Sequence, residues 1–194
     1  MRRYLGVAVA VVVGASTASA DSSRFGLAIS AGSVPVGDGG TLVGSQLAAS
    51  HWIGRFGVSV EGAALARTLG DGGVLSAAAS GHLQLGQYTT MVTALDGTRS
   101  PLSVGVELEA VAQHQWWDLD RATGAPSTMV GLGVAVTALS HDARRLVGIR
   151  AGVRLLVARD AEMDAVARRT SVTTDTRVHG VLVTIGTELG AFTN

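Results

Sequence analysis

Apolar and polar residues alternate along most of the chain with a period of two residues. The clearest run is Leu102–Gln113, in which Val106 and Leu108 share one face while Glu107 and Glu109 share the other. Successive side chains of a β-strand point to opposite faces, so strict alternation predicts strands. Gly and β-branched residues, which helices disfavour, are spread through the same segments. The pattern therefore predicts an all-β chain.

Eight segments carry this alternation, and most are close to the roughly 9–11 residues that a tilted membrane-spanning strand needs. The candidate strands are Phe25–Ser30, Leu42–His51, Phe56–Arg67, Leu75–Leu85, Leu102–Gln113, Val130–Thr137, Val147–Leu156 and Val181–Ala191. Between the fourth and the fifth, Gly86–Pro101 contains the stretch TTMVTAL, which suits a strand extension or an extra hairpin arm. The sequence therefore predicts about eight strands and leaves ten open.

Alternation alone does not say what each face meets. In a soluble sheet the apolar face lines the core, whereas in a membrane barrel it meets lipid and the polar face lines the interior. Here the polar faces are mostly Gly, Ser, Ala and Thr, unlike the charged surface of a solvated sheet. The apolar faces lack the large aromatic residues that usually fill a soluble β core. Both features favour an antiparallel up-and-down transmembrane β-barrel.

A third feature is the sign of the few charges inside the strands. Six of them fall on the predicted polar faces: Glu61, Glu107, Glu109, Arg150, Arg154 and Glu188. They belong to four strands and are opposite in sign, so they can meet at similar depth in a narrow interior. We expect a charge network in the lumen rather than six unrelated surface charges. Arg154→Leu should then destabilise the fold by leaving Glu107 or Glu109 unpaired.

The first twenty residues, MRRYLGVAVAVVVGASTASA, form a predicted signal peptide. Two arginines precede a short apolar run, and Ala18-Ser19-Ala20 supplies the small-x-small pattern that signal peptidases cleave. The apolar run is shorter than the roughly 20 residues that a spanning helix needs. We therefore expect cleavage after Ala20, with residues 21–194 forming the exported domain.

Composition excludes several other classes of protein. The chain of 194 residues has no Cys, so a disulfide scaffold or a Cys-based metal site is impossible. All 15 basic residues are Arg and they balance 15 acidic residues, whereas nucleic-acid binders usually carry a strongly basic surface. We expect no nucleic-acid partner. With 47% hydrophobic and 15% charged residues, the chain is also unlike a disordered tail.

The connections between candidate strands differ in length. Trp52–Arg55 and Ser140–Arg145 are short, whereas Gln115–Ser127 and Ala158–Thr176 are long and rich in charged residues. Membrane barrels have short periplasmic turns and longer extracellular loops. The two long segments are therefore the predicted surface-exposed loops, and Gly86–Pro101 departs from the pattern because it is long where a tight turn is expected.

Together, the signal peptide, the two-residue repeat, the loop lengths and the charged interior resemble the small eight-stranded outer-membrane barrels of Gram-negative bacteria, of the OmpA/OmpX type. The resemblance covers residues 24–192. In that family the last strand carries a signal read by the barrel-insertion machinery, and Thr184, Gly186, Leu189 and Ala191 match its spacing here. The resemblance implies outer-membrane lipids and the insertion machinery as partners, with the external partner unknown.

Motifs for chemistry are sparse. The five His residues form no metal-ligand spacing, and the glycines of VGDGGT lack the Lys-Ser/Thr of a phosphate loop. Ser140-His141-Asp142 contains the residue types of a hydrolytic triad, but adjacent residues rarely align for one. The acidic stretch DAEMD, residues 160–164, is typical of a solvated loop. We expect no cofactor, no metal and no catalytic residues.

The sequence thus favours a non-enzymatic integral outer-membrane barrel with a plugged polar lumen and a structural or surface-interaction role in the envelope. An eight-stranded barrel has an interior just filled by side chains, so no wide pore is expected. Two alternatives stay open: a soluble periplasmic barrel that binds a small apolar ligand, and an outer-membrane enzyme that modifies lipid.

Overall fold

The computed structural model describes most of the chain after the predicted signal peptide. The described residues are 21–33, 40–93, 97–118, 128–141, 144–159, 169–171 and 177–193. Residues 1–20 lie outside them, so the predicted signal peptide stays a prediction. Most of the two predicted surface loops also lies outside the described residues. The part of the chain that is described includes no helix of the length and apolar character needed to cross a membrane.

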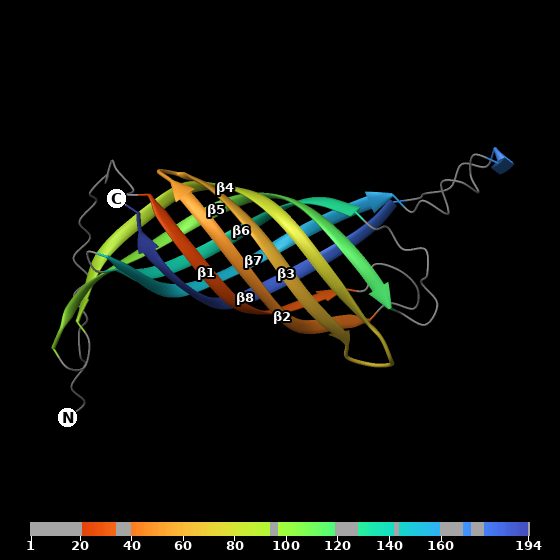
Figure 1. Ribbon diagram of the computed structural model, residues 1–194, viewed down its shortest axis with the longest axis horizontal. Helices are drawn as coiled ribbons and strands as arrows, with labels where there is room; N and C mark the ends of the chain where they lie inside the picture. Colours follow the sequence, from red (N-terminus) through yellow and green to blue (C-terminus); the bar gives the residue numbers. More distant parts are fainter. Residues whose placement is uncertain are drawn as a thin grey trace, which may run out of the picture.

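Eight β-strands make up almost all of the described part of the chain. They are β1 (Ser22–Ser33), β2 (Thr41–Ile53), β3 (Phe56–Arg67), β4 (Gly73–Thr93), β5 (Arg99–Asp118), β6 (Thr128–His141), β7 (Arg145–Arg159) and β8 (Arg177–Phe192). Each strand pairs antiparallel with the next, and β8 closes the ring by pairing with β1, for example Ser22 with Phe192. Figure 1 shows the resulting cylinder of tilted strands. The predicted all-β, up-and-down barrel of about eight strands is confirmed.

The barrel has two distinct ends. At the end called here the termini end, β1 starts and β8 finishes, and β2 is joined to β3 through Gly54 and Arg55 alone. The opposite end, called the distal end, holds the connection from β5 to β6 and the one from β7 to β8. Short connections thus gather at the termini end, and the two longest lie at the distal end, as the sequence pattern predicts.

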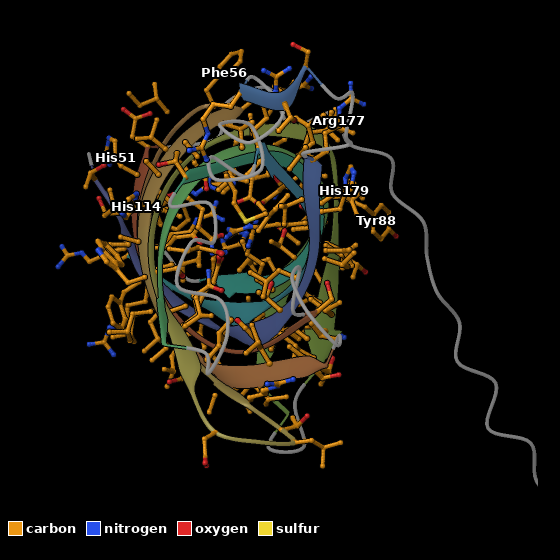
Figure 2. The ribbon with its side chains drawn as sticks, turned by 90° about the vertical axis from the view of Figure 1, so that its right-hand side faces the viewer. His51, Phe56, Tyr88, His114, Arg177 and His179 are labelled. Atoms are coloured by element: carbon orange, nitrogen blue, oxygen red, sulfur yellow. The ribbon has the colours of Figure 1, made fainter. Side chains whose placement is uncertain are left out.

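Side chains alternate between the outside and the inside along every strand. Large apolar residues point outward, as with Val106 at 39% exposed, Val134 at 49% and Ile149 at 55%. Glu107, next to Val106, is only 1% exposed. The apolar face is therefore the outer face, and the face that carries the charges is the inner one. Figure 2 looks along the barrel, with side chains inside the ring and around it; His51, Phe56 and Tyr88 are among those on the outside.

Inward-facing glycines allow the narrow ring to close. A Cβ atom added at Gly131 would lie 2.1 Å from the backbone oxygen of Leu155, and one at Gly148 would lie 2.2 Å from that of Ala138. No real Cβ atom tolerates such a distance. Neighbouring strands approach each other here in a way that only glycine permits, so part of the high glycine content serves the tight curvature of the barrel.

β4 and β5 are much longer than the other strands. They have 21 and 20 residues, whereas the other strands have 12 to 16. Their pairing runs from Gly73 and Asp118 to Thr93 and Arg99, with a register shift between Gln84 and Gly86. The predicted ambiguity at Gly86–Pro101 is thus resolved as a strand extension, and the count is eight rather than ten. In Figure 1 the two strands project beyond the rim at the termini end as a yellow-green ribbon.

Candidate functional site

The structure places all six charged residues of the predicted network inside the barrel. Their side chains are 2% to 15% exposed: Glu61, Glu107, Glu109, Arg150, Arg154 and Glu188. They come from β3, β5, β7 and β8, so strands far apart in the sequence bring them together. Each lies on the inner face because the two-residue period of its strand puts Val, Leu or Ile on the outside. The six residues form one charged layer across the middle of the barrel.

Arg154 is the centre of the tightest part of this layer. Its guanidinium donates to both carboxylate oxygens of Glu61, each at 2.6 Å, and to those of Glu109 at 2.8 and 2.5 Å. The Arg154 side chain is 3% exposed. Bidentate pairs of this kind are the strongest hydrogen bonds available to side chains. Arg154 therefore pairs with Glu61 and Glu109, and the expected contact with Glu107 is replaced by one with Glu61.

Arg150 holds a second, looser group. Its Nε donates to Glu107 at 3.2 Å and lies 3.9 Å from Glu188. Arg150 also connects the two groups, because its Nη2 is 3.7 Å from a Glu109 oxygen. A continuous chain of ion pairs therefore extends from Glu61 on β3 to Glu188 on β8.

Sequence reasoning missed several members of the layer. Arg24 lies inside the barrel, 3.5 Å from Glu188 and 3.8 Å from Glu107, with its guanidinium over the ring of Trp52. Trp52 is 2% exposed and also inside, although tryptophan near a strand end usually lies at a membrane interface. The two-residue alternation of β1 could have revealed Arg24, because it puts Arg24 on the same inner face as Gly26 and Ala28.

Two polar side chains complete the hydrogen bonding of Glu61. Gln46 donates to one of its oxygens at 2.5 Å, and Ser59 donates to the other at 3.0 Å. Gln46 in turn accepts a hydrogen bond from Ser30 at 2.9 Å. Both oxygens of Glu61 thus accept hydrogen bonds, from Gln46 on β2, from Arg154 on β7 and from Ser59 on its own strand, which is the condition under which a buried charge is tolerated.

His82 lies beside the Arg154 group and creates an arrangement with metal-ligand character. Ligand atoms of Glu61, His82 and Glu109 lie within 4.8 Å of one another. Spacing along the sequence could not show this cluster, because its members come from three strands. However, the guanidinium of Arg154 already bonds both carboxylates, so it holds the place between them that a cation would take. The cluster is best described as a carboxylate pair bridged by Arg154.

The same residues resemble a Ser–His–acid triad in composition but not in geometry. Ser59 lies 2.9 Å from Nε2 of His82, and Glu109 lies 3.9 Å from that same nitrogen. A catalytic triad needs the acid on the other ring nitrogen, where it orients the imidazole. Nδ1 of His82 is buried without a hydrogen-bond partner among the described residues. Ser59 moreover donates to Glu61, so nothing here prepares it as a nucleophile.

The interior is apolar toward the distal end. Two clusters of buried side chains lie there: Leu42, Leu65, Val74 and Leu182 in one, and Val111, Met129, Leu156, Ala158 and Val178 in the other. Gln113 and Gln115 are buried among them. The predicted polar lumen therefore describes the middle layer, whereas the distal part of the interior is filled by aliphatic side chains.

Two small cavities lie inside the described part of the barrel. A cavity of about 40 Å³ is lined by Trp52, Glu61, His82 and Glu188, among others, and another of about 20 Å³ by Gln113, Gln115 and Met129. A cavity needs a volume of roughly 10–15 Å³, counted in the same way, to hold one water molecule. These cavities have room for a few water molecules rather than for an organic ligand.

The predicted insertion signal lies on β8. Thr184 and Gly186 face inward, whereas Leu189 at 55% exposed and Ala191 face outward. Phe192 packs edge-on against His141 at 5.9 Å. No described feature tests recognition by the insertion machinery, so this role stays a prediction. Of the contiguous Ser140-His141-Asp142, Asp142 lies outside the described residues.

The closed ring with an apolar outside and a charged inside places this chain among the eight-stranded antiparallel β-barrels. A solved structure shares this fold, that of Neisserial surface protein A (NspA). The TM-score is 0.52, over 90% of this chain and 98% of that chain, at 14% sequence identity. No protein-family model and no curated protein matches the sequence. The likeness therefore concerns the fold alone.

Proposed function

We propose that this protein is an integral outer-membrane β-barrel with a plugged interior and a structural or surface-interaction role in the envelope. The observation that carries the proposal is the orientation of the faces. Large apolar side chains are exposed on the outside of every strand, including Ile29 at 63%, Val60 at 65% and Leu132 at 70%. Each would cost about 1.5–3 kcal/mol to leave in water, so lipid is the solvent in which this exterior is stable.

The outer membrane is the membrane that fits. Only closed barrels and helices satisfy their backbone hydrogen bonds in lipid, and closed barrels of this type belong to outer membranes. The predicted signal peptide supports export, and NspA, which shares the fold, is a surface protein, which is in line with export. Short connections at the termini end support a periplasmic position for that end, and the long connections support an extracellular position for the distal end.

The interior supports a closed barrel rather than a pore. The charged layer crosses the middle, and aliphatic side chains fill the space on its distal side. A permeating ion would have to displace the buried Arg154 group and then pass through an apolar layer, and both steps are costly. The proposed role therefore depends on the barrel exterior and the distal loops.

Fractionation of the envelope tests the membrane placement. The protein should stay in the outer-membrane fraction after high salt and osmotic shock, and it should migrate differently in gels before and after boiling. Release by osmotic shock alone would support the soluble periplasmic alternative instead. In planar bilayers the purified barrel should show no steady conductance, and a stable open channel would refute the plugged interior.

A further inference from the structure

Among the described residues, the long β4–β5 ribbon leaves a long edge of β4 without a partner strand. β4 pairs with β3 as far as Leu83 opposite Phe56, and the amide of Gln84 donates to the backbone oxygen of Arg55. Beyond that point, within the described part of the chain, β4 continues to Thr93 paired with β5 only. At about 3.3 Å per residue, the nine residues from Leu85 to Thr93 expose an edge of roughly 30 Å.

The two edges of the ribbon differ in how they are protected. Natural proteins blunt exposed strand edges with charged residues, with proline or with very short strands. At the termini end, the part of β5 that is not paired with β6 is three residues long, Arg99–Pro101, and contains both an arginine and a proline. On β4 the unpaired part reads LGQYTTMVT and contains neither a charge nor a proline. The β4 edge is therefore long, neutral and open to pairing.

We propose that the free edge of β4, Leu85–Thr93, is a docking site for an extended segment of another polypeptide at the termini end. The segment adds one strand to the ribbon, and its affinity comes from backbone hydrogen bonds along the edge. Side chains at alternate positions provide the selectivity. The docked segment is therefore uncharged and alternates apolar with small polar residues.

The two faces of the ribbon fix that alternation. Tyr88 and Thr90 pair with Val104 and Leu102, which continue the apolar outside of the barrel. Thr89 lies on the other face and bonds Ser103 at 2.9 Å. Apolar residues of the docked segment therefore lie beside Tyr88 and Val92, and its polar residues lie beside Gln87 and Thr89.

A second copy of this chain does not fit the edge. Two copies in one membrane share the same orientation and are related by an axis along the membrane normal. With strands tilted about 35–45° from that normal, equivalent edges cross at roughly 80° and pair neither parallel nor antiparallel. The other free edge, Arg99–Pro101, is too short and too protected for a head-to-tail contact. Only the exclusion of a second copy rests on the proposed membrane placement.

Hydrogen exchange on the full chain tests the proposal. The edge amides of Leu85–Thr93 should exchange at least about tenfold more slowly in native outer-membrane vesicles than in the purified barrel in nanodiscs. Amides of the β4–β5 pairing should exchange equally in both samples and serve as the internal control. Equal exchange of the edge amides in both samples overturns the proposal. The barrel's heat-modifiable migration is measured on the same samples, so failure of the membrane placement is seen separately.

Proline substitution shows whether protection comes from backbone pairing. Of the adjacent amides at Thr89 and Thr90, one faces β5 and the other faces the free edge, because amides alternate along a strand. Exchange in the purified barrel identifies the free one as the faster. Proline there should abolish cross-linking from a photoreactive residue at Met91, whereas alanine at the same position should retain it. A cross-link between two copies or to residues 1–20 of the same chain overturns the assignment of the occupant, and a proline-insensitive cross-link overturns the edge-pairing mechanism.

Discussion

Removal of the Arg154 guanidinium is the sharpest test of the charged layer. Arg154→Leu keeps a side chain of similar stem length but deletes four charge-assisted hydrogen bonds to Glu61 and Glu109. These carboxylates have side chains 4% and 2% exposed, so bulk solvent cannot replace the lost donors. Two buried like charges are then left a few ångströms apart without the cation between them.

Arg154→Leu should lower the unfolding free energy by about 3–5 kcal/mol at neutral pH, which is the range measured when one partner of a buried ion pair is removed. The sum of four individual hydrogen bonds would be larger, but it would ignore the solvation that Arg154 itself regains in the unfolded chain. Adding Glu61→Gln and Glu109→Gln to the variant should recover part of the loss, because it removes the two unpaired charges.

Urea unfolding in lipid vesicles, followed by gel migration, measures the effect. Arg159→Leu is the matched control, because Arg159 lies on the same strand with its side chain exposed. It should change the unfolding free energy by less than about 1 kcal/mol. If Arg154→Leu also stays below about 1 kcal/mol, with the slope of unfolding unchanged, then the interior network does not stabilise the barrel and the reasoning fails.

Three further predictions concern packing and orientation. Gly131→Ala should lower the unfolding free energy by at least about 1–3 kcal/mol, because its Cβ would meet the Leu155 backbone, whereas Gly81→Ala, with nothing within 4 Å, should be nearly neutral by the same urea assay. Val134 lies on the outside at the level of the charged layer, so Val134→Arg should lower the unfolding free energy in vesicles by about 2–4 kcal/mol. An equal loss for Leu69→Arg, in the β3–β4 turn, would contradict the placement of the apolar face toward lipid. In single-tryptophan variants, brominated lipid should quench Trp116, which is 54% exposed, but leave the buried Trp52 fluorescent; strong quenching of Trp52 would place it outside the barrel.

The charged layer itself could be read from the sequence only as a set of candidates. The two-residue period put Glu61, Glu109 and Arg154 on inner faces, because the parity of each strand is a local property. Which carboxylate meets which guanidinium depends on register and curvature, which no single strand carries. The sequence therefore suggested Glu107 or Glu109 as a partner of Arg154, and the closed ring brings Glu109 and Glu61 there.

Other members of the site had no local signal. Trp52 and His82 lie inside at 5.5 Å from each other, and the Glu61–His82–Glu109 cluster forms from three strands. Spacing along a chain reveals such groups only when they share one helix, strand or loop. The apolar filling at the distal end was also unexpected, since Val74 and Leu156 lie on the inner faces of their strands, which the sequence pattern assigns to polar and small residues.

The sequence by itself determined the strands and their two faces, because alternation is set by backbone geometry within each strand. The residue types on the faces favoured an outward position for the apolar face, and the closed ring shows that position. Tertiary structure decided how the strands close, that β4 and β5 extend past the rim, and which buried charges meet. Those features arise from contacts between segments far apart in the sequence, such as Arg24 and Glu188, which are 164 residues apart. Register across the ring is fixed by all eight strands at once, so it appears only when the barrel is complete.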